Sequence, residues 1–352
     1  MSENTALFSF IHQMIDTNGD IGVGQFMSLC LGHPQHGYYM TQEAFGEKGD
    51  FTTAPEISQS FGEMVALWVI TQWENMGKPD PVQLVELGPG RGTLMKDIWR
   101  GLSAKPELRD ILSVHMVEFS PRLRDMQRAN LPDVPVTWHE DIATVPYVPT
   151  LIVANEFFDA LPIEQAIRHQ NNWYQRVITT AEEDLLFSIG KPLQGIASHK
   201  DATDGMIYEY APIATEIMSD LCARIYDTTG AMLVIDYGDD VPLDERFGDT
   251  LQALYKHKPV SVFDHIGTSD VTAHVAFRNL SLVAQENLCA VLPVQTQGEF
   301  LKSYGIELRL KALLQKADMS QAADLQSGVN RLIAPDQMGD LFKVLQVFCY
   351  DA

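Results

Sequence analysis

Residues 82–92 read Val82-Gln83-Leu84-Val85-Glu86-Leu87-Gly88-Pro89-Gly90-Arg91-Gly92, an apolar run that ends in a glycine-rich turn. The apolar run predicts a buried strand, and the residues from Thr93 to Leu102 predict a helix directly after the turn. Glycines let the backbone turn tightly and approach a ligand that any Cβ atom would block. The start of the helix adds free N–H groups and the positive end of a dipole. The stretch therefore predicts a strand–turn–helix unit that binds a ligand at its turn.

Alternating strands and helices continue the chain beyond this unit. We predict strands at 111–118, 136–139 and 150–154, a helix at 121–130, and a further buried strand at 230–238. This alternation indicates a parallel sheet with crossover helices, so the expected fold class is α/β with a Rossmann-like sheet.

The other segments predict additions to this sheet. Helical apolar spacing at 5–31 and 58–76 flanks a stretch rich in glycine, proline and aromatic residues, which we interpret as an ordered lid. Three β-rich runs between 165 and 189 predict an antiparallel insert, whereas 240–272 reads mostly as loop. We therefore expect four segments. The first is an N-terminal helical and lid segment (1–80), the second is the first part of the ligand-binding domain (81–163), and the third is a β-rich insert (164–214). The fourth (215–352) is the second part of the ligand-binding domain, and it contains a loop-rich insertion on the substrate side at about 238–275.

The composition is that of a globular protein with a strong excess of acid. Of 352 residues, 45% are hydrophobic and 20% are charged, and the formal net charge is −22. This charge repels the phosphates of nucleic acids and anionic lipids, and it attracts cationic substrates or basic protein segments. A contribution to solubility alone is the alternative explanation.

The sequence lacks the motifs of cysteine metal sites, targeting peptides and membrane spans. The four cysteines form no CxxC pair, so we expect buried thiols and neither a metal site nor a disulfide scaffold. The first residues match neither a signal peptide nor a transit peptide, and no apolar run reaches about 18 residues. We expect a cytoplasmic protein with no membrane span.

Polar residues follow the predicted strands in a regular order. Glu118 ends the strand after the glycine-rich turn, where an acid can accept hydrogen bonds from both hydroxyls of a ribose. Asp141 and Ile142 follow the next strand, at a position suited to an adenine base. Each signal alone is weak, because an acid at a strand end is usually solvated. Together with Glu86 and the three glycines, Gly88, Gly90 and Gly92, they predict a nucleoside cofactor.

Further cofactor contacts are expected from two other places. Asn155 directly follows the fourth strand, and Asp50 and Thr53 belong to the lid. A local turn without any ligand is the alternative role for Asp50 and Thr53.

The glycine spacing identifies the cofactor class. It follows E-x-G-x-G-x-G, which has one residue fewer before the last glycine than the dinucleotide pattern G-x-G-x-x-G. This spacing resembles the motif of class I S-adenosylmethionine methyltransferases. The expected cofactor is therefore S-adenosyl-L-methionine.

Blocks along nearly the whole chain resemble the MidA family, the bacterial and mitochondrial relatives of the complex I assembly-factor methyltransferase. These blocks are His33–Tyr39, Gly49–Glu56, Val85–Met95, Val117–Pro121, Asn155–Pro162, Ile235–Gly238, Tyr255–His257, Asp270–Val275, Thr296–Gly298 and Met338–Val344. The resemblance implies a class I methyltransferase that, in the mitochondrial members, methylates an arginine of a respiratory complex I subunit. The family usually has an acid after His274-Val275, where this chain has Ala276.

The candidate acceptor site follows the fourth strand. Glu156 and Asp159 place two carboxylates within one turn, and they could hold a guanidinium by bidentate hydrogen bonds. Alternatively, these two residues cap the next helix. His274 and His257 are candidate proton carriers or substrate contacts, although a lone histidine is more often structural.

Three functions stay open at this point. The first is an arginine methyltransferase that acts on a basic segment of a protein, the second is a methyltransferase for a small molecule, and the third is a cofactor-binding assembly chaperone with little catalysis. The sequence leaves the oligomeric state open.

Overall fold

The computed structural model describes residues 5–41, 53–196 and 202–350, and the chain divides into two compact units. The unit that carries the glycine-rich turn comprises 52–158, 218–238 and 281–352, and we call it the glycine-loop unit. The other, the insert unit, comprises 1–51, 159–217 and 239–280. The expected segment 1–80 is divided between them, because Phe61 and Trp68 of helix α5 (Gln59–Asn75) pack into the core of the glycine-loop unit.

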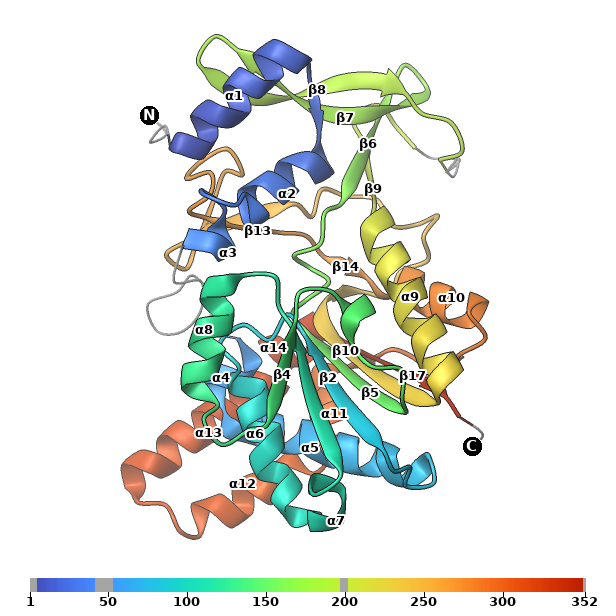
Figure 1. The fold of residues 1–352 in the computed structure, drawn as a ribbon. Helices are drawn as coiled ribbons and strands as arrows, with labels where there is room; N and C mark the ends of the chain where they lie inside the picture. The colour runs from blue at the N-terminus through green and yellow to red at the C-terminus, as the bar shows by residue number, and fades with distance from the viewer. Residues whose placement is uncertain (1–4, 42–52, 197–201, 351–352) are drawn as a thin grey trace. The chain divides into compact units, whose positions relative to one another are not determined.

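A large, mostly parallel sheet forms the centre of the glycine-loop unit (Figure 1). Its strand order is β15-β17-β10-β5-β2-β3-β4, with the strands from β10 to β4 parallel and β17 antiparallel to β10. The strands are β2 (Val82–Leu87), β3 (Leu112–Val117), β4 (Val136–His139), β5 (Thr150–Asn155), β10 (Gly230–Asp239), β15 (Ala290–Val291), β16 (Gln295–Thr296) and β17 (Phe342–Cys349).

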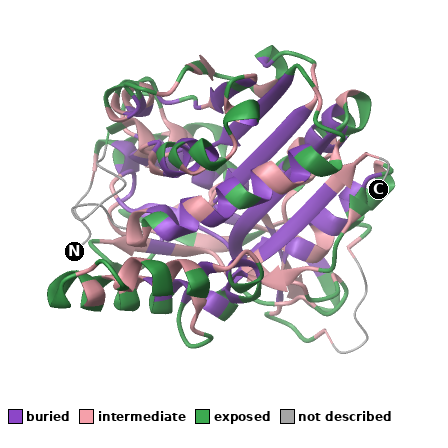
Figure 2. Cartoon of the chain, turned by 90° about the horizontal axis from the view of Figure 1, so that it is seen from below, coloured by how far each residue is buried: buried purple, intermediate pink, exposed green. Residues whose placement is uncertain are grey.

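Helices cover this sheet and complete the core. Apolar residues from strands and helices, among them Leu84, Met95 and Ile98, are fully buried in one cluster, and Figure 2 shows the long strands as buried. The helices are α4 (Ala54–Ile57), α5 (Gln59–Asn75), α6 (Thr93–Gly101), α7 (Pro106–Arg109), α8 (Pro121–Asn130), α11 (Gln297–Ser303), α12 (Ile306–Leu314), α13 (Met319–Ile333) and α14 (Met338–Leu341). Two helices, α9 (Pro212–Thr228) and α10 (Phe277–Glu286), begin in the insert unit and end in the glycine-loop unit.

The insert unit has its own core between three helices and antiparallel strands. The helices are α1 (Ala6–Asn18), α2 (Val23–Gly32) and α3 (Tyr38–Thr41). One sheet has the order β1-β7-β6-β9 with β8 beside β7, and a second has the order β12-β11-β13. Ile11, Phe26 and Val271 are fully buried between these elements. The strands are β1 (Ile21–Gly22), β6 (Glu164–His169), β7 (Asn172–Ala181), β8 (Asp184–Pro192), β9 (Ile207–Tyr210), β11 (Gln252–Tyr255), β12 (Lys258–Val260), β13 (Asp270–Thr272) and β14 (Val275–Ala276).

The α/β class and the mostly parallel sheet are confirmed, and 240–272 is mostly loop as expected. The structure adds elements that were not predicted. The segment 240–272 contains the short strands β11, β12 and β13. The hairpin turn between β11 and β12 has Lys256 and His257 at positive φ, so no glycine in the sequence marks this turn. The helix α13 was not predicted, although Asp318 and Gln321 form a capping box at its start.

Two of the four cysteines form a disulfide, although buried thiols were predicted. Strand β15 runs antiparallel to β17 with Ala290 opposite Phe348, and this register brings the neighbouring Cys289 and Cys349 together as a disulfide. Cys30 and Cys222 are buried free thiols.

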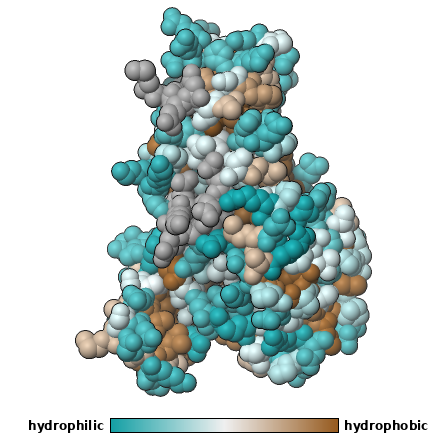
Figure 3. All heavy atoms as spheres, turned by 60° about the vertical axis from the view of Figure 1, so that its left-hand side comes forward, coloured by the Kyte–Doolittle hydropathy of each residue, from teal (hydrophilic) through white to brown (hydrophobic). Residues whose placement is uncertain are grey.

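The surface is mainly polar, with isolated hydrophobic side chains. Hydrophilic residues dominate the face in Figure 3, and exposed hydrophobic residues include Leu308 and Met319. In the described parts of the chain, no helix has both the length and the hydrophobicity to cross a bilayer.

Candidate functional site

The glycine-rich turn joins strand β2 to helix α6 through left-handed backbone. Gly88, Gly90 and Gly92 have φ angles of 58°, 52° and 81°, which L-residues with a Cβ atom rarely adopt. A Cβ at Gly88 would lie 2.9 Å from Cδ2 of Phe157, and a Cβ at Gly92 would lie 2.9 Å from Cδ1 of Leu131. The turn therefore depends on glycine for both conformation and space.

Glu86 is a buried acid with unused hydrogen-bonding capacity. Its exposed fraction is 3%, and burial raises its pKa to about 8. Its Oε2 atom is buried without a hydrogen-bond partner among the described residues. An unsatisfied buried carboxyl oxygen is costly for the fold, and a donor from a ligand would remove that cost.

Glu118 lies at the same edge of the sheet as the turn. The Gly88 N–H donates to the carbonyl of Val117 at 3.1 Å, so the end of β3 meets the start of the turn. Glu118 is 4% exposed, and burial raises its pKa to about 7 even though the Ser120 N–H donates to Oε1 at 2.8 Å. Phe119 beside it is 51% exposed, so an aromatic ring is available next to a buried acid.

Gln127 of helix α8 connects the turn and the acid. Its Nε2 donates to the Gly90 carbonyl at 2.8 Å and lies 3.4 Å from Oε2 of Glu118. Its Oε1 accepts from the Trp138 indole at 2.9 Å. Sequence analysis missed Gln127 and Phe119, because glutamine or phenylalanine near a strand end has no distinctive pattern.

Asp141 and Ile142 follow strand β4 and begin a short 3-10 helix. The Asp141 carboxylate accepts from the Ala143 N–H at 2.9 Å, so this exposed residue caps its own turn. The Ile142 carbonyl accepts from Arg224 at 2.8 Å, which anchors the turn. These contacts leave the Ile142 side chain half-buried, as an apolar contact for a base requires.

Asn155 and Glu156 form a strained corner after strand β5. Glu156 has a φ of 50°, a conformation that is uncommon for a residue with a Cβ atom and is often retained at functional sites. Its Oε1 accepts from the Asn155 side chain and from the Ala54 N–H, both at 3.2 Å. Thr53, directly before Ala54, is the N-cap residue of α4. These bonds join the end of the lid to the strand corner.

Asp159 lies in the insert unit and bonds through its backbone to Ala273, the residue before His274. The Ala273 N–H donates to the Asp159 carbonyl at 3.1 Å, and Asp159 is 7% exposed. The His274 N–H donates to Thr250 Oγ1 at 3.0 Å, and burial together with nearby Arg246 lowers the pKa of His274. The histidine is therefore mainly neutral at pH 7.

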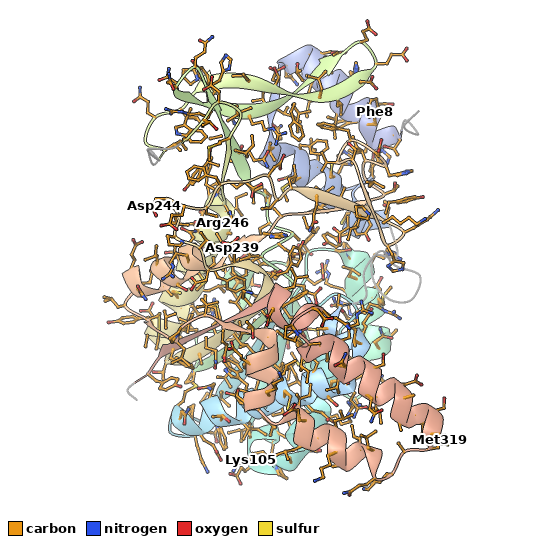
Figure 4. The ribbon with its side chains drawn as sticks, turned by 180° about the vertical axis from the view of Figure 1, so that it is seen from behind. Phe8, Lys105, Asp239, Asp244, Arg246 and Met319 are labelled. Atoms are coloured by element: carbon orange, nitrogen blue, oxygen red, sulfur yellow. A yellow bond between two sulfur atoms is a disulfide. The ribbon has the colours of Figure 1, made fainter. Side chains whose placement is uncertain are left out.

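A buried ionic network supports His274, and sequence analysis missed it. The Arg246 side chain is 9% exposed, and its Nε lies 3.0 Å and 3.1 Å from the two oxygens of Asp239, beside which it is drawn in Figure 4. Its Nη2 donates to the His274 carbonyl at 2.8 Å, and its Nη1 lies 3.8 Å from Oε2 of Glu209. These four residues are distant in sequence, so no local pattern reveals the network.

Two of the predicted site residues are not part of the site described above. His257 is exposed in the β11–β12 turn, so it has the features of a turn residue. Asp50 lies outside the described residues.

The edge of the sheet fits a nucleoside cofactor with an amino-acid end. Glu118 offers a buried acid to a ribose, Phe119 and Ile142 offer apolar contacts to a base, and Glu86 has an unsatisfied oxygen. The glycine turn allows close approach of a ligand to the backbone.

The chain is similar in sequence to a family model and to several named proteins. A family model described as "Putative S-adenosyl-L-methionine-dependent methyltransferase" matches residues 64–294. "Protein arginine methyltransferase NDUFAF7, mitochondrial" from Xenopus laevis is 37% identical, covering 97% of this chain and 84% of that protein. The protein of the same name from Homo sapiens is 34% identical, covering 96% and 82%.

A solved structure also matches almost the whole chain. It is a Burkholderia thailandensis protein bound to S-adenosyl-homocysteine, with a TM-score of 0.86 and 26% identity. The match covers 99% of this chain and 93% of that one.

Proposed function

The chain belongs to this family of S-adenosyl-L-methionine-dependent methyltransferases, and we propose that it methylates an arginine side chain of a protein substrate. The arginine acceptor is supported by the names of relatives that are 34% and 37% identical over nearly the whole chain. The net charge of −22 supports a basic substrate segment, because it favours encounter with cations. The MidA resemblance makes a respiratory complex I subunit the expected substrate.

We propose that the residues around the glycine turn hold the cofactor. Glu118 accepts from the ribose, Asp141 and Ile142 border the base, and Glu86 and Asn155 face the amino-acid end. When bound, S-adenosyl-L-methionine supplies a methyl group on a positively charged sulfur. The buried, unsatisfied oxygen of Glu86 is the observation that carries this assignment.

The acceptor residues must hold a guanidinium, which stays charged at any physiological pH. We assign this role to Glu156 and Asp159, since paired carboxylates orient a guanidinium through bidentate hydrogen bonds. The left-handed backbone of Glu156 and its bonds from Asn155 and Ala54 restrict its rotation. Such positioning can contribute on the order of 7–11 kcal/mol to a transfer reaction. His274, mainly neutral at pH 7, is the candidate to accept the proton that the acceptor nitrogen loses.

The test is a transfer assay on purified basic protein substrate with a parallel cofactor titration. Glu156→Gln and Asp159→Asn should each reduce methyl transfer about 100-fold or more, as expected when a positioning group is lost. Cofactor affinity should change less than about threefold, which is below 1 kcal/mol. Glu183→Gln, at an exposed turn of the insert, is the matched control and should change neither quantity.

Wild-type transfer rates in both acceptor variants would show that these carboxylates only cap the corner. Methylation of a small molecule and of no protein would also contradict the proposal. Two finer expectations belong to it: a basic segment around the acceptor arginine and a bacterial cytoplasmic location.

A further inference from the structure

A pocket of about 470 Å³ lies entirely within the insert unit. It is bordered by one face of helix α2, by the residues directly before and at the start of β6, and by the first residues of α9. Its volume is in the range of pockets that bind small molecules or single side chains. None of the residues assigned above to the cofactor or the acceptor lines it.

The walls of the pocket are mainly apolar. Leu29, Pro34, Pro162 and Ile213 line it, and Ile213 is 40% exposed at the rim. Such walls suit the aliphatic part of a long side chain, which gains by leaving water while its polar end is satisfied elsewhere.

One carboxylate also lines this pocket, and its hydrogen bonding is incomplete. Glu164 accepts from the Gly24 N–H and the Gln175 side chain, and the charge of Lys191 favours its ionised form. Its Oε2 is nevertheless buried without a partner among the described residues, and burial raises the pKa of Glu164. A cation beside this carboxylate would compensate for the lost solvation.

Two glycines bring the carboxylate against helix α2. A Cβ at Gly22 would lie 2.9 Å from Oε2 of Glu164, and a Cβ at Gly24 would lie 2.8 Å from Oε1. Larger residues at these positions would displace Glu164. His33 is the other titratable residue of the pocket lining, and burial and nearby His36 lower its pKa. It is therefore mainly uncharged at pH 7 and does not repel a cation.

We propose that this pocket binds a lysine or arginine side chain of the protein substrate, at a subsite separate from the methyl acceptor. The apolar walls take the aliphatic part of the side chain, and Glu164 pairs with its charged end. The identity of the occupant as substrate rests on the proposed function, whereas the binding of a basic side chain does not.

The experiment measures binding to the full chain without cofactor. The probes are acetyl-Gly-Arg-Gly-amide, its lysine counterpart, and the uncharged citrulline peptide. The methyl resonance of Met27 reports on the pocket, because its sulfur accepts the N–H of Ile163 between two lining residues. The arginine and lysine peptides should shift this resonance saturably, and the citrulline peptide should bind at least tenfold more weakly.

Two variants test the contacts. Glu164→Gln keeps the size of the side chain and should weaken the arginine peptide ten- to 100-fold. Ile213→Arg places a cation at the rim and should weaken it similarly. Ile189→Arg is the matched control, because Ile189 is also 40% exposed and does not line the pocket. It should leave binding unchanged.

Equal binding of the arginine and citrulline peptides, or unchanged binding in both Glu164→Gln and Ile213→Arg, would overturn the subsite. That result would leave arginine methylation intact, since the assay contains no methyl transfer. Conversely, normal peptide binding without methylation of any protein would contradict the proposed function and leave the subsite in place.

Discussion

The glycine-rich turn of one unit and the Arg246 network of the other treat secluded charge in opposite ways. In the glycine-loop unit, Glu86 and Glu118 are buried acids whose pKa values are raised mainly by burial, to about 8 and about 7. In the insert unit, Arg246 is equally secluded but pairs with Asp239 and Glu209. This difference in pairing indicates two different roles for secluded charged groups. Charges that the protein leaves incompletely satisfied indicate a ligand site, and charges that it satisfies itself hold the fold.

The largest effect should come from breaking the satisfied network. Arg246→Met removes the charge and leaves the buried Glu209 and the partly exposed Asp239 without their cationic partner. This change should lower the free energy of unfolding by about 3 kcal/mol, the low end for breaking a buried ion pair. Arg128→Met is the matched control, because the Arg128–Asp125 pair is exposed and should contribute about 0–1 kcal/mol. Equilibrium urea unfolding measures both. Equal losses would show that the network contributes no more than a surface ion pair.

The second prediction tests the ligand site through its backbone. Gly90→Val places a β-branched residue at a φ of 52° and adds a side chain at the turn, so affinity for S-adenosyl-homocysteine should fall at least about 100-fold. Gly77→Val is the control, since Gly77 has a φ of 80° in a turn with no atom within 4 Å of its Cβ position. It should lose some stability and keep its affinity. Calorimetry that finds equal affinity in both variants would contradict the placement of the cofactor.

The smallest expected effect is the pH dependence of cofactor affinity, which tests whether Glu118 binds the ligand as a charged carboxylate. If ribose binds to the carboxylate form, a pKa of about 7 means that affinity falls as the pH drops through 7. Wild-type affinity should therefore weaken about tenfold from pH 8 to pH 6. Glu118→Gln should weaken binding about tenfold at pH 8, as for a lost hydrogen bond to a charged group. It should also remove most of the pH dependence.

The control for this measurement is Glu140→Gln. Glu140 is 71% exposed and pairs with Arg124, so its replacement should leave the affinity and its pH profile unchanged. A wild-type affinity that stays constant between pH 6 and pH 8 would show that Glu118 does not bind the ligand as a carboxylate.

Local patterns predicted the elements of the glycine-loop unit well. The strand Val82–Leu87, the turn after it and helix α8 follow the residues expected from hydrophobic runs, glycines and caps. The cofactor class also followed from the sequence, because the glycine spacing resembles the motif of class I S-adenosylmethionine methyltransferases. Two features were not predicted. The short strands within 240–272 lack clear alternation, and the capping signal at Asp318 was not recognised as the start of helix α13.

The candidate site could be predicted only in part. Glu118 and Asn155 were identifiable because the ends of parallel strands lie at one edge of a sheet. Gln127 was not, because its role depends on two hydrogen bonds to residues 37 and nine positions away. The roles of all the residues assigned to the cofactor and to the acceptor stay predictions.

The sequence by itself determined the α/β sheet, the glycine turn and the cofactor, since each depends on residues that are neighbours along the chain. Tertiary structure alone decided how the insert unit is assembled from three separate stretches and how Arg246 meets Asp239, Glu209 and His274. It also decided that Glu86 and Glu164 each keep an unsatisfied buried oxygen. The physical reason is that burial and pairing of a charge depend on groups from distant segments, which no periodicity or spacing records.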